Sequence, residues 1–524
     1  MTVTLILGSR FLAHICRKRW FCAIIALITK GRGRMVIAMA SLHDRIEGVL
    51  LGTAAGDALG APYEFQPARG PELEVAMVGG GGFGWEPGEW TDDTSMAIAI
   101  AEVAATGADL REEEALDAIV GRWHEWSRDA KDIGMQTSSV MRAAQQQGLS
   151  AHTARTASAA LHERTGRTGG NGSLMRTAPV ALAYLDDEVG LVEAARAVSV
   201  LTHFDPDASD ACVLWCCAIR HAVLNGELDV RIGLQHIDAD RRPTWASLLD
   251  VAEESQPSDF KNNGWVVEAL QGAWSAIANT PVPEDDPAGG VFRVDHLRRA
   301  LDAAVRAGDD TDTVAAIAGG LLGAAYGASA VPLEWRQLLH GWPGMRAHDL
   351  VNLASAIARG GKPDLFDFSY FDSPIDTVAV HPHDDKVLLG GIGVLRDLPD
   401  DVDAVVSLCR LADDDMRDDM PHAEVRLIDQ PGSDDNPHLD FVLTDAARAV
   451  ERLRDEGRTV LLHCVAAHSR TPTVAALYGA RRYSISTQQA LSDVVSVLPQ
   501  AHPNPAFRDA LKRLDPTIRQ GEVD

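Results

Sequence analysis

The chain contains 524 residues, of which 46% are hydrophobic and 23% are charged, proportions typical of folded globular proteins. At about 100–200 residues per domain, this length predicts two or more domains. The net charge of −27 argues against DNA or RNA as a partner, because contacts between cationic side chains and phosphates dominate nucleic-acid affinity.

Residues 1–42 are predicted to be an N-terminal extension that is either disordered or not translated, with Met35 or Met39 as alternative starts. The apolar run at 21–29 is too short to span a bilayer, and no other stretch is apolar for long enough, so we expect no membrane partner. The seven cysteines follow no zinc-binding spacing and indicate a reduced, cytoplasmic protein.

Residues 43–345 are rich in alanine and leucine and show the apolar period of α-helices, so we expect a mostly α-helical domain. Glycine-rich breaks at 79–84 and 166–172 separate the helical runs. The runs with helical periodicity are residues 93–105, 180–184, 190–200, 209–224 and 313–326.

Two clusters of carboxylates and threonine hydroxyls stand directly before apolar helices, at residues 88–94 and 308–313. One such cluster alone is typical of a helix cap, because Asp and Thr side chains accept hydrogen bonds from the free N–H groups of the first turn. Two such similar clusters together offer more side-chain oxygens than the capping of two helices requires. Hard divalent cations such as Mg²⁺ take oxygen ligands, so the pair predicts a metal site built from two distant segments.

Two further segments combine glycines with polar residues. Residues 52–65 read as a glycine-punctuated helix followed by a turn and Glu64, and residues 169–179 as a flexible loop whose N–H groups can approach a phosphate. Glycines also follow the second carboxylate cluster within residues 319–327. Such small residues allow close packing, so we expect the two cluster-bearing helices to meet in the core.

The segments that carry this chemistry occur in the order GDALGAPYEF, EWTDDTSM, GGNGSLMRTAPVA, LTHFDPDASDAC and GDDTDTVAAIAGGLLGAAYG. Together they resemble the ADP-ribosylglycohydrolase family, which includes the dinitrogenase reductase activating glycohydrolases, over residues 43–345. The resemblance implies an all-helical fold that holds two Mg²⁺ or Mn²⁺ ions in a central cleft. It also implies a hydrolase that removes ADP-ribose from modified proteins or from small molecules.

The resemblance assigns roles to individual residues, motif by motif. Glu64 matches a glutamate that lies near the metals and acts in catalysis in some members, and His203 matches a histidine that contacts substrate. Asn171, Gly172 and Ser173 would line the phosphate and ribose site. The implied metal ligands are Thr91, Asp92, Asp93, Asp310, Asp312 and Thr313.

The reaction expected from this resemblance breaks the bond between the anomeric carbon of a ribose and a side-chain nitrogen or oxygen. Its transition state should resemble an oxocarbenium ion, as in other glycosyl transfers. Bound metals can orient the sugar hydroxyls and can lower the pKa of a water molecule. Glu64 or a carboxylate of the two clusters could accept the proton of that water, and the sequence leaves this choice open.

Proline, aspartate and aromatic residues gather between 360 and 385, which predicts a linker at 346–374 and a second domain at 375–524. In the second domain, short β-rich runs alternate with a helix at 441–454, a pattern typical of an α/β fold with a mainly parallel sheet. The expected strands are residues 387–392, 404–408, 425–428 and 459–462.

A cysteine lies between the last expected strand and the next helix, in the order His463-Cys464-x5-Arg470-Thr471. A helix N-terminus lowers the pKa of such a thiol, the loop N–H groups can bind a phosphate, and an arginine six residues later can hold two of its oxygens. The segment resembles the dual-specificity and tyrosine phosphatase family over residues 375–515. The resemblance implies a phosphorylated substrate, no cofactor, and Asp429 as general acid.

Two points about this second motif stay open in the sequence. Asp434 and Asp435 are alternatives to Asp429 as the general acid. The family usually has glycine three residues after the cysteine, whereas this chain has Ala467. If that position requires a positive φ, the loop is strained and the domain binds phosphate without rapid turnover.

Three hypotheses follow for the whole chain. The first is a two-domain enzyme that releases ADP-ribose and hydrolyses phosphoesters. The second is a phosphatase of proteins or small molecules whose helical domain is a metal-bound ADP-ribose sensor. The third is an ADP-ribose-binding module without catalysis. The sequence favours the first, because every metal ligand that the resemblance implies is present.

Overall fold

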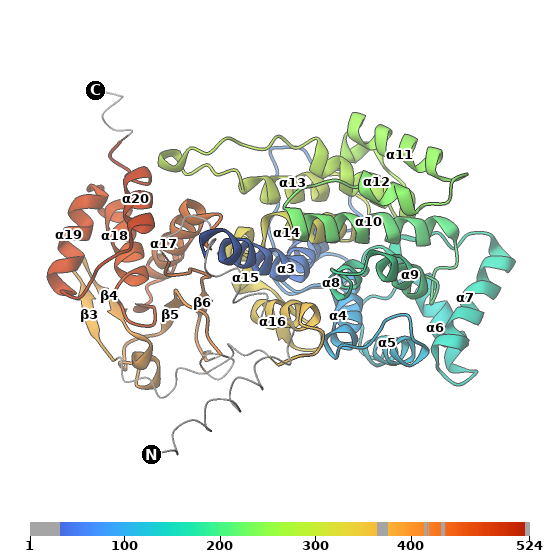
Figure 1. Cartoon of the computed structure of the whole chain (residues 1–524), viewed down its shortest axis with the longest axis horizontal. Helices are drawn as coiled ribbons and strands as arrows, with labels where there is room; N and C mark the ends of the chain where they lie inside the picture. Colours follow the sequence, from blue (N-terminus) through green and yellow to red (C-terminus); the bar gives the residue numbers. More distant parts are fainter. Residues whose placement is uncertain are drawn as a thin grey trace, which may run out of the picture.

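The computed structural model describes residues 32–363, 376–412, 415, 417, 419–430 and 435–518. Figure 1 shows a large body of helices, which contains the N-terminal two-thirds of the chain, beside a smaller part that contains the strands of a sheet. The expected helical domain is therefore confirmed. None of the helices in the described ranges combines the length and the apolar character needed to cross a bilayer.

The helical body is built around α3 and α14, and the other helices pack around them. Its helices are α3 (Arg32–Gly60), α4 (Asp92–Ala105), α5 (Glu113–Trp126), α6 (Met135–Gln145), α7 (Ala151–Thr165), α8 (Ala178–Ala183), α9 (Glu188–Ser199), α10 (Pro206–Asn225), α11 (Arg242–Glu254), α12 (Val266–Ala278), α13 (Asp295–Arg306), α14 (Thr311–Tyr326), α15 (Leu333–Leu338) and α16 (Ala347–Ala358). Helix α3 begins inside the predicted extension, because residues 34–47 contain no glycine or proline that would break it. Residues 1–31 lie outside the described part of the chain.

Glycines bring two helix backbones into direct contact in the core. A Cβ atom added to Gly323 of α14 would overlap the carbonyl oxygen of Gly48 in α3, and one added to Gly319 would overlap the carbonyl oxygen of Gly52. The expectation of close helix packing is correct in kind. The partner is different: α14 packs mainly against α3, and not against α4, which carries the first carboxylate cluster.

We expect Gly323→Ala to lower the free energy of unfolding by about 3 kcal/mol, because the new methyl group forces two backbones apart in a packed core. The matched control is Gly121→Ala in α5, where an added Cβ meets no atom within 4 Å. Alanine there should stabilise the protein by about 0.5–1 kcal/mol, since it reduces the entropy of the unfolded chain. Urea unfolding of both variants measures the difference, and equal midpoints would contradict the packing argument.

The C-terminal part contains a five-stranded sheet in the order β3-β4-β7-β5-β6. Strand β3 pairs antiparallel with β4, and the remaining neighbours are parallel. The strands are β3 (Val378–His381), β4 (Asp384–Gly390), β5 (Ala404–Ser407), β6 (His422–Glu424) and β7 (Val460–His463). The α/β character expected for residues 375–524 is thus present as a small mixed sheet.

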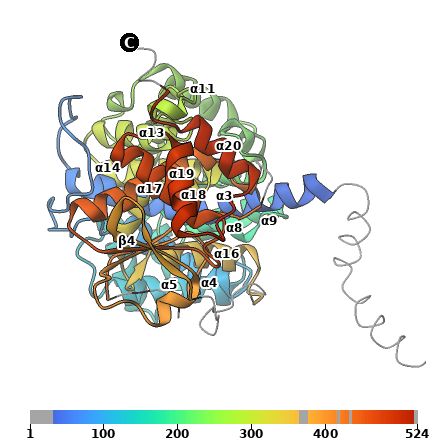
Figure 2. The ribbon, with the colours of Figure 1, turned by 90° about the vertical axis from the view of Figure 1, so that its left-hand side faces the viewer.

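The helices of this part are α17 (Leu439–Asp455), α18 (Arg470–Tyr483), α19 (Thr487–Val497) and α20 (Pro505–Arg513). In Figure 2, which views the molecule from this side, they lie in front of the helical body. One expected strand is wrong: residues 425–428 follow the edge strand β6 without belonging to it. Their apolar side chains Val425 and Leu427 are nevertheless buried. The apolar run in the sequence therefore indicates buried side chains and does not by itself indicate a strand.

Helix α16 lies inside the range predicted as the linker and packs against α3 and α4. Its apolar side chains Leu350, Ala354 and Ile357 are spaced at helical intervals and are buried. The prediction of a linker missed this spacing because it was based on the polar residues farther along the chain. The helical body therefore extends beyond residue 345. Residues 364–375, the last part of the predicted linker with the start of the predicted second domain, are outside the described ranges.

The two parts of the chain contact each other through side chains of both kinds. The rings of Phe292 and Phe441 lie edge to face with their centroids 5.7 Å apart. The N–H of Leu333 donates to Asp445 at 2.8 Å. The guanidinium of Arg426 lies 3.5 Å from the carboxylate of Glu47 in α3. The helix that crosses the core therefore also contacts the C-terminal part.

Candidate functional site

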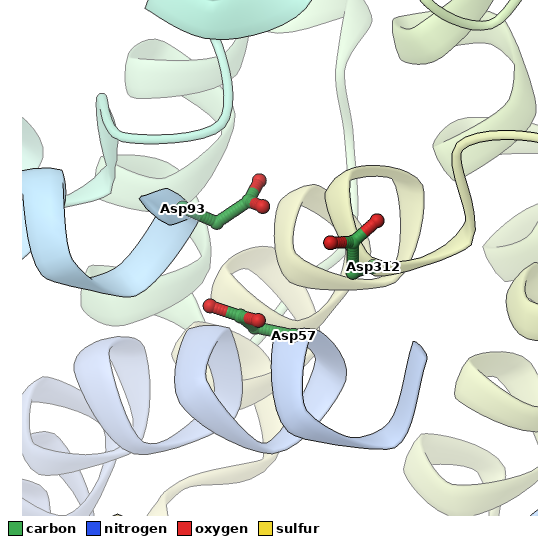
Figure 3. Close-up of side chains that lie close together, drawn as sticks. All are labelled: Asp57, Asp93 and Asp312. Atoms are coloured by element: carbon green, nitrogen blue, oxygen red, sulfur yellow. The ribbon is translucent and has the colours of Figure 1, made fainter. Parts of the chain in front are cut away.

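Three buried aspartates from three helices point toward one another in the helical body. Asp57 of α3, Asp93 of α4 and Asp312 of α14 each place a carboxylate oxygen within 4.8 Å of the other two (Figure 3). A second triad, Glu64, Asp310 and Asp312, satisfies the same distance. Because Asp312 belongs to both triads, the five carboxylates form one continuous cluster.

Local structure explains how the two sequence clusters reach this place. Thr91 caps α4 and Asp93 lies in its first turn, while Asp310 precedes α14 and Asp312 lies in the first turn of that helix. The positive ends of two helix dipoles therefore face the carboxylates. Asp57 lies near the end of α3 and accepts hydrogen bonds from the N–H groups of Thr91 and Thr94, at 2.9 and 3.0 Å.

The two predicted threonine ligands are joined to the cluster through Asp93. The hydroxyl of Thr91 donates to Oδ2 of Asp93 at 3.0 Å, and the hydroxyl of Thr313 donates to the same oxygen at 3.3 Å. The segments around residues 91 and 313 are thus brought together, as the sequence predicted. Asp92 is half-buried and belongs to neither triad.

Several carboxylate oxygens of the cluster are buried without a hydrogen-bond partner: Oδ1 of Asp93, Oδ1 of Asp312 and Oε2 of Glu64. Burial, reinforced by the neighbouring carboxylates, raises the pKa of Glu64 to about 9 and the pKa of Asp312 well above its ordinary value. Unpaired buried carboxylates are costly unless a cation compensates them. An all-oxygen donor set of this kind fits a hard divalent cation.

The glycine-rich loop lies against the second carboxylate cluster. Its short 3₁₀ turn η2 (Asn171–Ser173) places the amide of Asn171 where it donates to Oδ2 of Asp310 at 2.8 Å and to the carbonyl oxygen of Asn263 at 2.9 Å. The hydroxyl of Ser173 is buried beside the thiol of Cys212. This hydroxyl is therefore directed into the protein interior.

His203 packs against the same turn. A Cβ atom added to Gly172 would lie 3.0 Å from Cε1 of His203, so glycine permits the close approach of the ring. The loop, His203 and the carboxylate cluster thus lie in one region. The predicted substrate-contacting residues therefore lie together.

Two residues of this region were not among the predicted ones. Asp57 reads as part of a glycine-rich helix, and its signal in the sequence is a lone carboxylate within an apolar run that must be buried. The side-chain oxygen of Asn263 accepts from the N–H of Asp310 at 3.1 Å. Asn263 follows no motif, so its part in holding the second cluster could not be read from the sequence.

The second predicted site lies at the carboxyl ends of the parallel strands. Cys464 follows β7 and is buried, and Arg470 begins α18 and donates to the carbonyl oxygens of Leu408 and Leu427, at 3.0 and 3.1 Å. Asp429 is exposed and accepts from the side chain of Asn504 at 3.0 Å.

Asn504 links Asp429 to the cysteine loop, because its backbone N–H donates to the hydroxyl of Ser469 at 3.1 Å. The predicted general acid thus lies beside the loop that follows Cys464. Asp435 is buried, and Asp434 lies outside the described residues.

Comparisons with known proteins match the helical body to one family. The family model for ADP-ribosylglycohydrolase matches residues 38–364. The ADP-ribosylarginine hydrolase Tri1 of Pseudomonas putida is 32% identical over 56% of this chain and 73% of its own length. The ADP-ribosyl-[dinitrogen reductase] glycohydrolase of Rhodospirillum rubrum is 30% identical over 56% of this chain and 90% of its own.

A solved structure, that of human DUSP28, matches 28% of this chain and 99% of its own, at 22% identity and a TM-score of 0.25. These values are too low to assign a family to any part of the chain. The family model, in contrast, spans more than half of the chain and includes every carboxylate of the cluster. The chain belongs to the ADP-ribosylglycohydrolase family.

Proposed function

We propose that the helical body is a metal-dependent hydrolase that removes ADP-ribose from modified proteins or from small molecules. The observation that carries this proposal is the pair of carboxylate triads that share Asp312 and leave buried oxygens without partners. Two triads favour two ions, Mg²⁺ or Mn²⁺, with Asp57, Asp93, Asp310 and Asp312 as ligands.

Bound cations of this kind would help to orient the ribose hydroxyls and to lower the pKa of a nearby water. The protein supplies the remaining parts. Asn171 is fixed by its bonds to Asp310 and Asn263, and it holds the glycine loop where loop N–H groups can bind phosphate oxygens. His203 lies against this loop and can bind the same part of the substrate.

We assign the role of general base to Glu64. Its Oε2 is buried without a partner, and it follows the short turn η1 (Ala61–Tyr63), whereas Asp93 and Asp312 lie within helices. Bound cations would offset the neighbouring carboxylates that raise the pKa of Glu64, so its side chain would be ionised in the loaded site. A carboxylate that ligates a cation is a weaker proton acceptor than one beside it. In this scheme Glu64 accepts the proton of the attacking water, while the aspartates hold the cations.

Arginine-linked ADP-ribose is the first substrate to test. One relative is named for ADP-ribosylarginine and another for ADP-ribosylated dinitrogen reductase. The scissile bond of ADP-ribosylarginine joins the ribose to a guanidinium nitrogen, which leaves well only when it retains a proton. A serine-linked substrate, in which the leaving atom is oxygen, provides the comparison.

Chelation of divalent cations should lower the release of ADP-ribose by about 100-fold or more, because the carboxylate cluster cannot act without compensation of its charge. The purified full-length protein is incubated with mono-ADP-ribosylated protein, and free ADP-ribose is quantified by chromatography. Mg²⁺ or Mn²⁺ added back should restore the rate. Full activity after exhaustive chelation would contradict the metal dependence, and no activity with any linkage would contradict the hydrolase.

We propose a phosphatase-like domain for the C-terminal part as a second candidate function. The observation in its favour is local: Cys464 follows a parallel strand, a loop follows it, and α18 begins six residues later at Arg470. Asp429 lies beside that loop through Asn504. The domain boundaries near 345–375 are part of the same proposal. The rival scheme, a phosphatase with an ADP-ribose sensor, requires that the metal-loaded protein release no ADP-ribose.

Strain at Ala467 should limit this second activity. Ala467 has φ of +55°, a left-handed conformation that costs a residue with a Cβ about 1–2 kcal/mol and a glycine almost nothing. We therefore expect Ala467→Gly to stabilise the protein by about 1 kcal/mol and to raise phosphatase turnover, because the loop reaches its phosphate-binding form more easily. Melting temperature and hydrolysis of p-nitrophenyl phosphate measure the two effects. Lower stability in the glycine variant would contradict the strain argument.

A further inference from the structure

Arg176 is a buried cation whose guanidinium contacts no carboxylate of the described residues. It is fully buried, its guanidinium lies 3.9 Å from the centre of the Trp123 ring, and one of its nitrogens donates to the hydroxyl of Thr202 at 2.7 Å. A second nitrogen lies 3.7 Å from the sulfur of Met96. Burying a charge in such surroundings is energetically costly, so the placement of Arg176 against Thr202 requires a reason within this chain.

The protons of this group can be assigned from what each atom is able to donate. An arginine donates and never accepts, so Thr202 must accept from Arg176 with a lone pair of its oxygen. Thr202 is fully buried, and its other partner is Nδ1 of His203 at 2.7 Å. If that nitrogen carried a proton, the hydroxyl proton of Thr202 would have no acceptor among the described residues. Nδ1 of His203 therefore accepts, and the neutral ring carries its proton on Nε2.

The protonated nitrogen faces the glycine loop. A Cβ atom added to Gly172 would lie 3.2 Å from Nε2 of His203, and one added to Gly170 would lie 3.4 Å from it. Between these glycines stands Asn171, which is bonded to Asp310 of the carboxylate cluster. The Nε2–H group thus points at the loop that lies against the proposed metal site, and it has no acceptor among the described residues.

We infer that Arg176 and Thr202 are positioning residues that lock His203 as the neutral Nε2–H tautomer and so give the site a fixed donor for an oxygen of the ADP-ribose unit. The inference rests on the proposed function for the identity of the ligand. It assigns His203 to binding and not to proton abstraction, because the nitrogen that faces the loop already carries a proton. Burial and the nearby positive charge of Arg176 lower the pKa of His203 well below its ordinary value, which keeps the ring neutral.

The tautomer can be measured directly in the full-length protein labelled with ¹⁵N-histidine. Two-bond ¹⁵N–¹H spectra distinguish the tautomers, and His203→Gln identifies the signal by its loss. We expect the Nε2–H pattern in the wild type and in Thr202→Ser, which keeps the hydroxyl. Thr202→Val, of the same shape but without a hydroxyl, should lose the lock and show the Nδ1–H form or a mixture of both. An Nδ1–H pattern in the wild type, or an unchanged pattern in Thr202→Val, would overturn the inference.

Kinetics separate this inference from the proposed function. With an ADP-ribosylated protein as substrate, Thr202→Val should raise KM about tenfold with a smaller change in kcat. Thr202→Ser, which keeps the hydroxyl, should have the KM of the wild type. Equal KM values for wild type and Thr202→Val, with a changed tautomer, would overturn the binding role. If the wild type releases no ADP-ribose, the proposed function fails, while the tautomer spectra still decide whether the lock exists. Melting temperatures of all variants verify that each is folded.

Discussion

Asp312→Asn should abolish the release of ADP-ribose, with kcat/KM lowered by about 10³-fold or more. Asp312 is the carboxylate that both triads share, so its loss removes a ligand from each of the two proposed ions. Its Oδ1 is buried without a partner, which is the state expected of an atom reserved for a cation. The assay is the chromatographic measurement of free ADP-ribose at saturating Mg²⁺ or Mn²⁺.

The same variant should lose activity but gain stability when no metal is bound. Burial and the surrounding carboxylates raise the pKa of Asp312, so its ionised form is disfavoured in the folded protein. Without metal, the wild type therefore loses stability as pH rises above the ordinary range of aspartate, because the unfolded chain ionises more readily. At neutral pH the metal-free Asp312→Asn protein should melt at a higher temperature than the metal-free wild type. It should also gain less from added metal.

Asp309→Asn is the matched control for this experiment. Asp309 is exposed, lies three residues from Asp312, and has φ of +60°, a conformation that asparagine adopts as readily as aspartate. Asp309→Asn, which also replaces a carboxylate with an amide, should leave the rate of ADP-ribose release and the stabilisation by metal almost unchanged. Equal losses in the two variants would show that net charge near the cluster, and not ligation by Asp312, governs activity.

The sequence was informative where chemistry is concentrated in short segments. Both carboxylate clusters and the glycine loop stand out because each has several unusual residues within a few positions, whereas His203 was assigned only through the family resemblance. The structure adds that Asp57 completes one triad. Asp57 is a single carboxylate near the end of α3, and only the tertiary approach of α3 to α4 brings it to the N–H groups of Thr91 and Thr94.

Other features depend on contacts that periodicity does not encode. The glycines after the second cluster predicted close packing, but α3 and not α4 proved to be the main partner, since a pattern of small residues does not name the surface that it meets. Ser173 lies in the predicted glycine-rich loop, but its hydroxyl is directed to the Cys212 thiol. Residues 425–428 looked like a strand because their apolar side chains are buried, whereas strand pairing ends at Glu424.

Cys464→Ser should eliminate phosphatase activity, with a loss of about 10⁴-fold or more, and leave the release of ADP-ribose unchanged. In the proposed reaction the thiolate of Cys464 attacks phosphorus and the ester oxygen leaves with a proton from Asp429. Water then hydrolyses the phosphocysteine. Hydroxyls are far weaker acids than thiols, so a serine in this place would not ionise at neutral pH. The substrate is p-nitrophenyl phosphate or a phosphotyrosine peptide.

The neighbouring Cys409 provides the control that makes this result specific. It follows β5, which pairs with β7 in parallel register, so the two cysteines stand at the ends of adjacent strands. Burial raises the pKa of Cys409 to about 12, so its thiol is protonated at neutral pH and cannot replace Cys464 as nucleophile. Cys409→Ser should therefore retain phosphatase activity. Loss of ADP-ribose release in Asp312→Asn alone and of phosphate release in Cys464→Ser alone would establish two independent active sites. Phosphate release that survives in Cys464→Ser would remove the phosphatase from the description of this chain and leave the hydrolase as its one proposed activity.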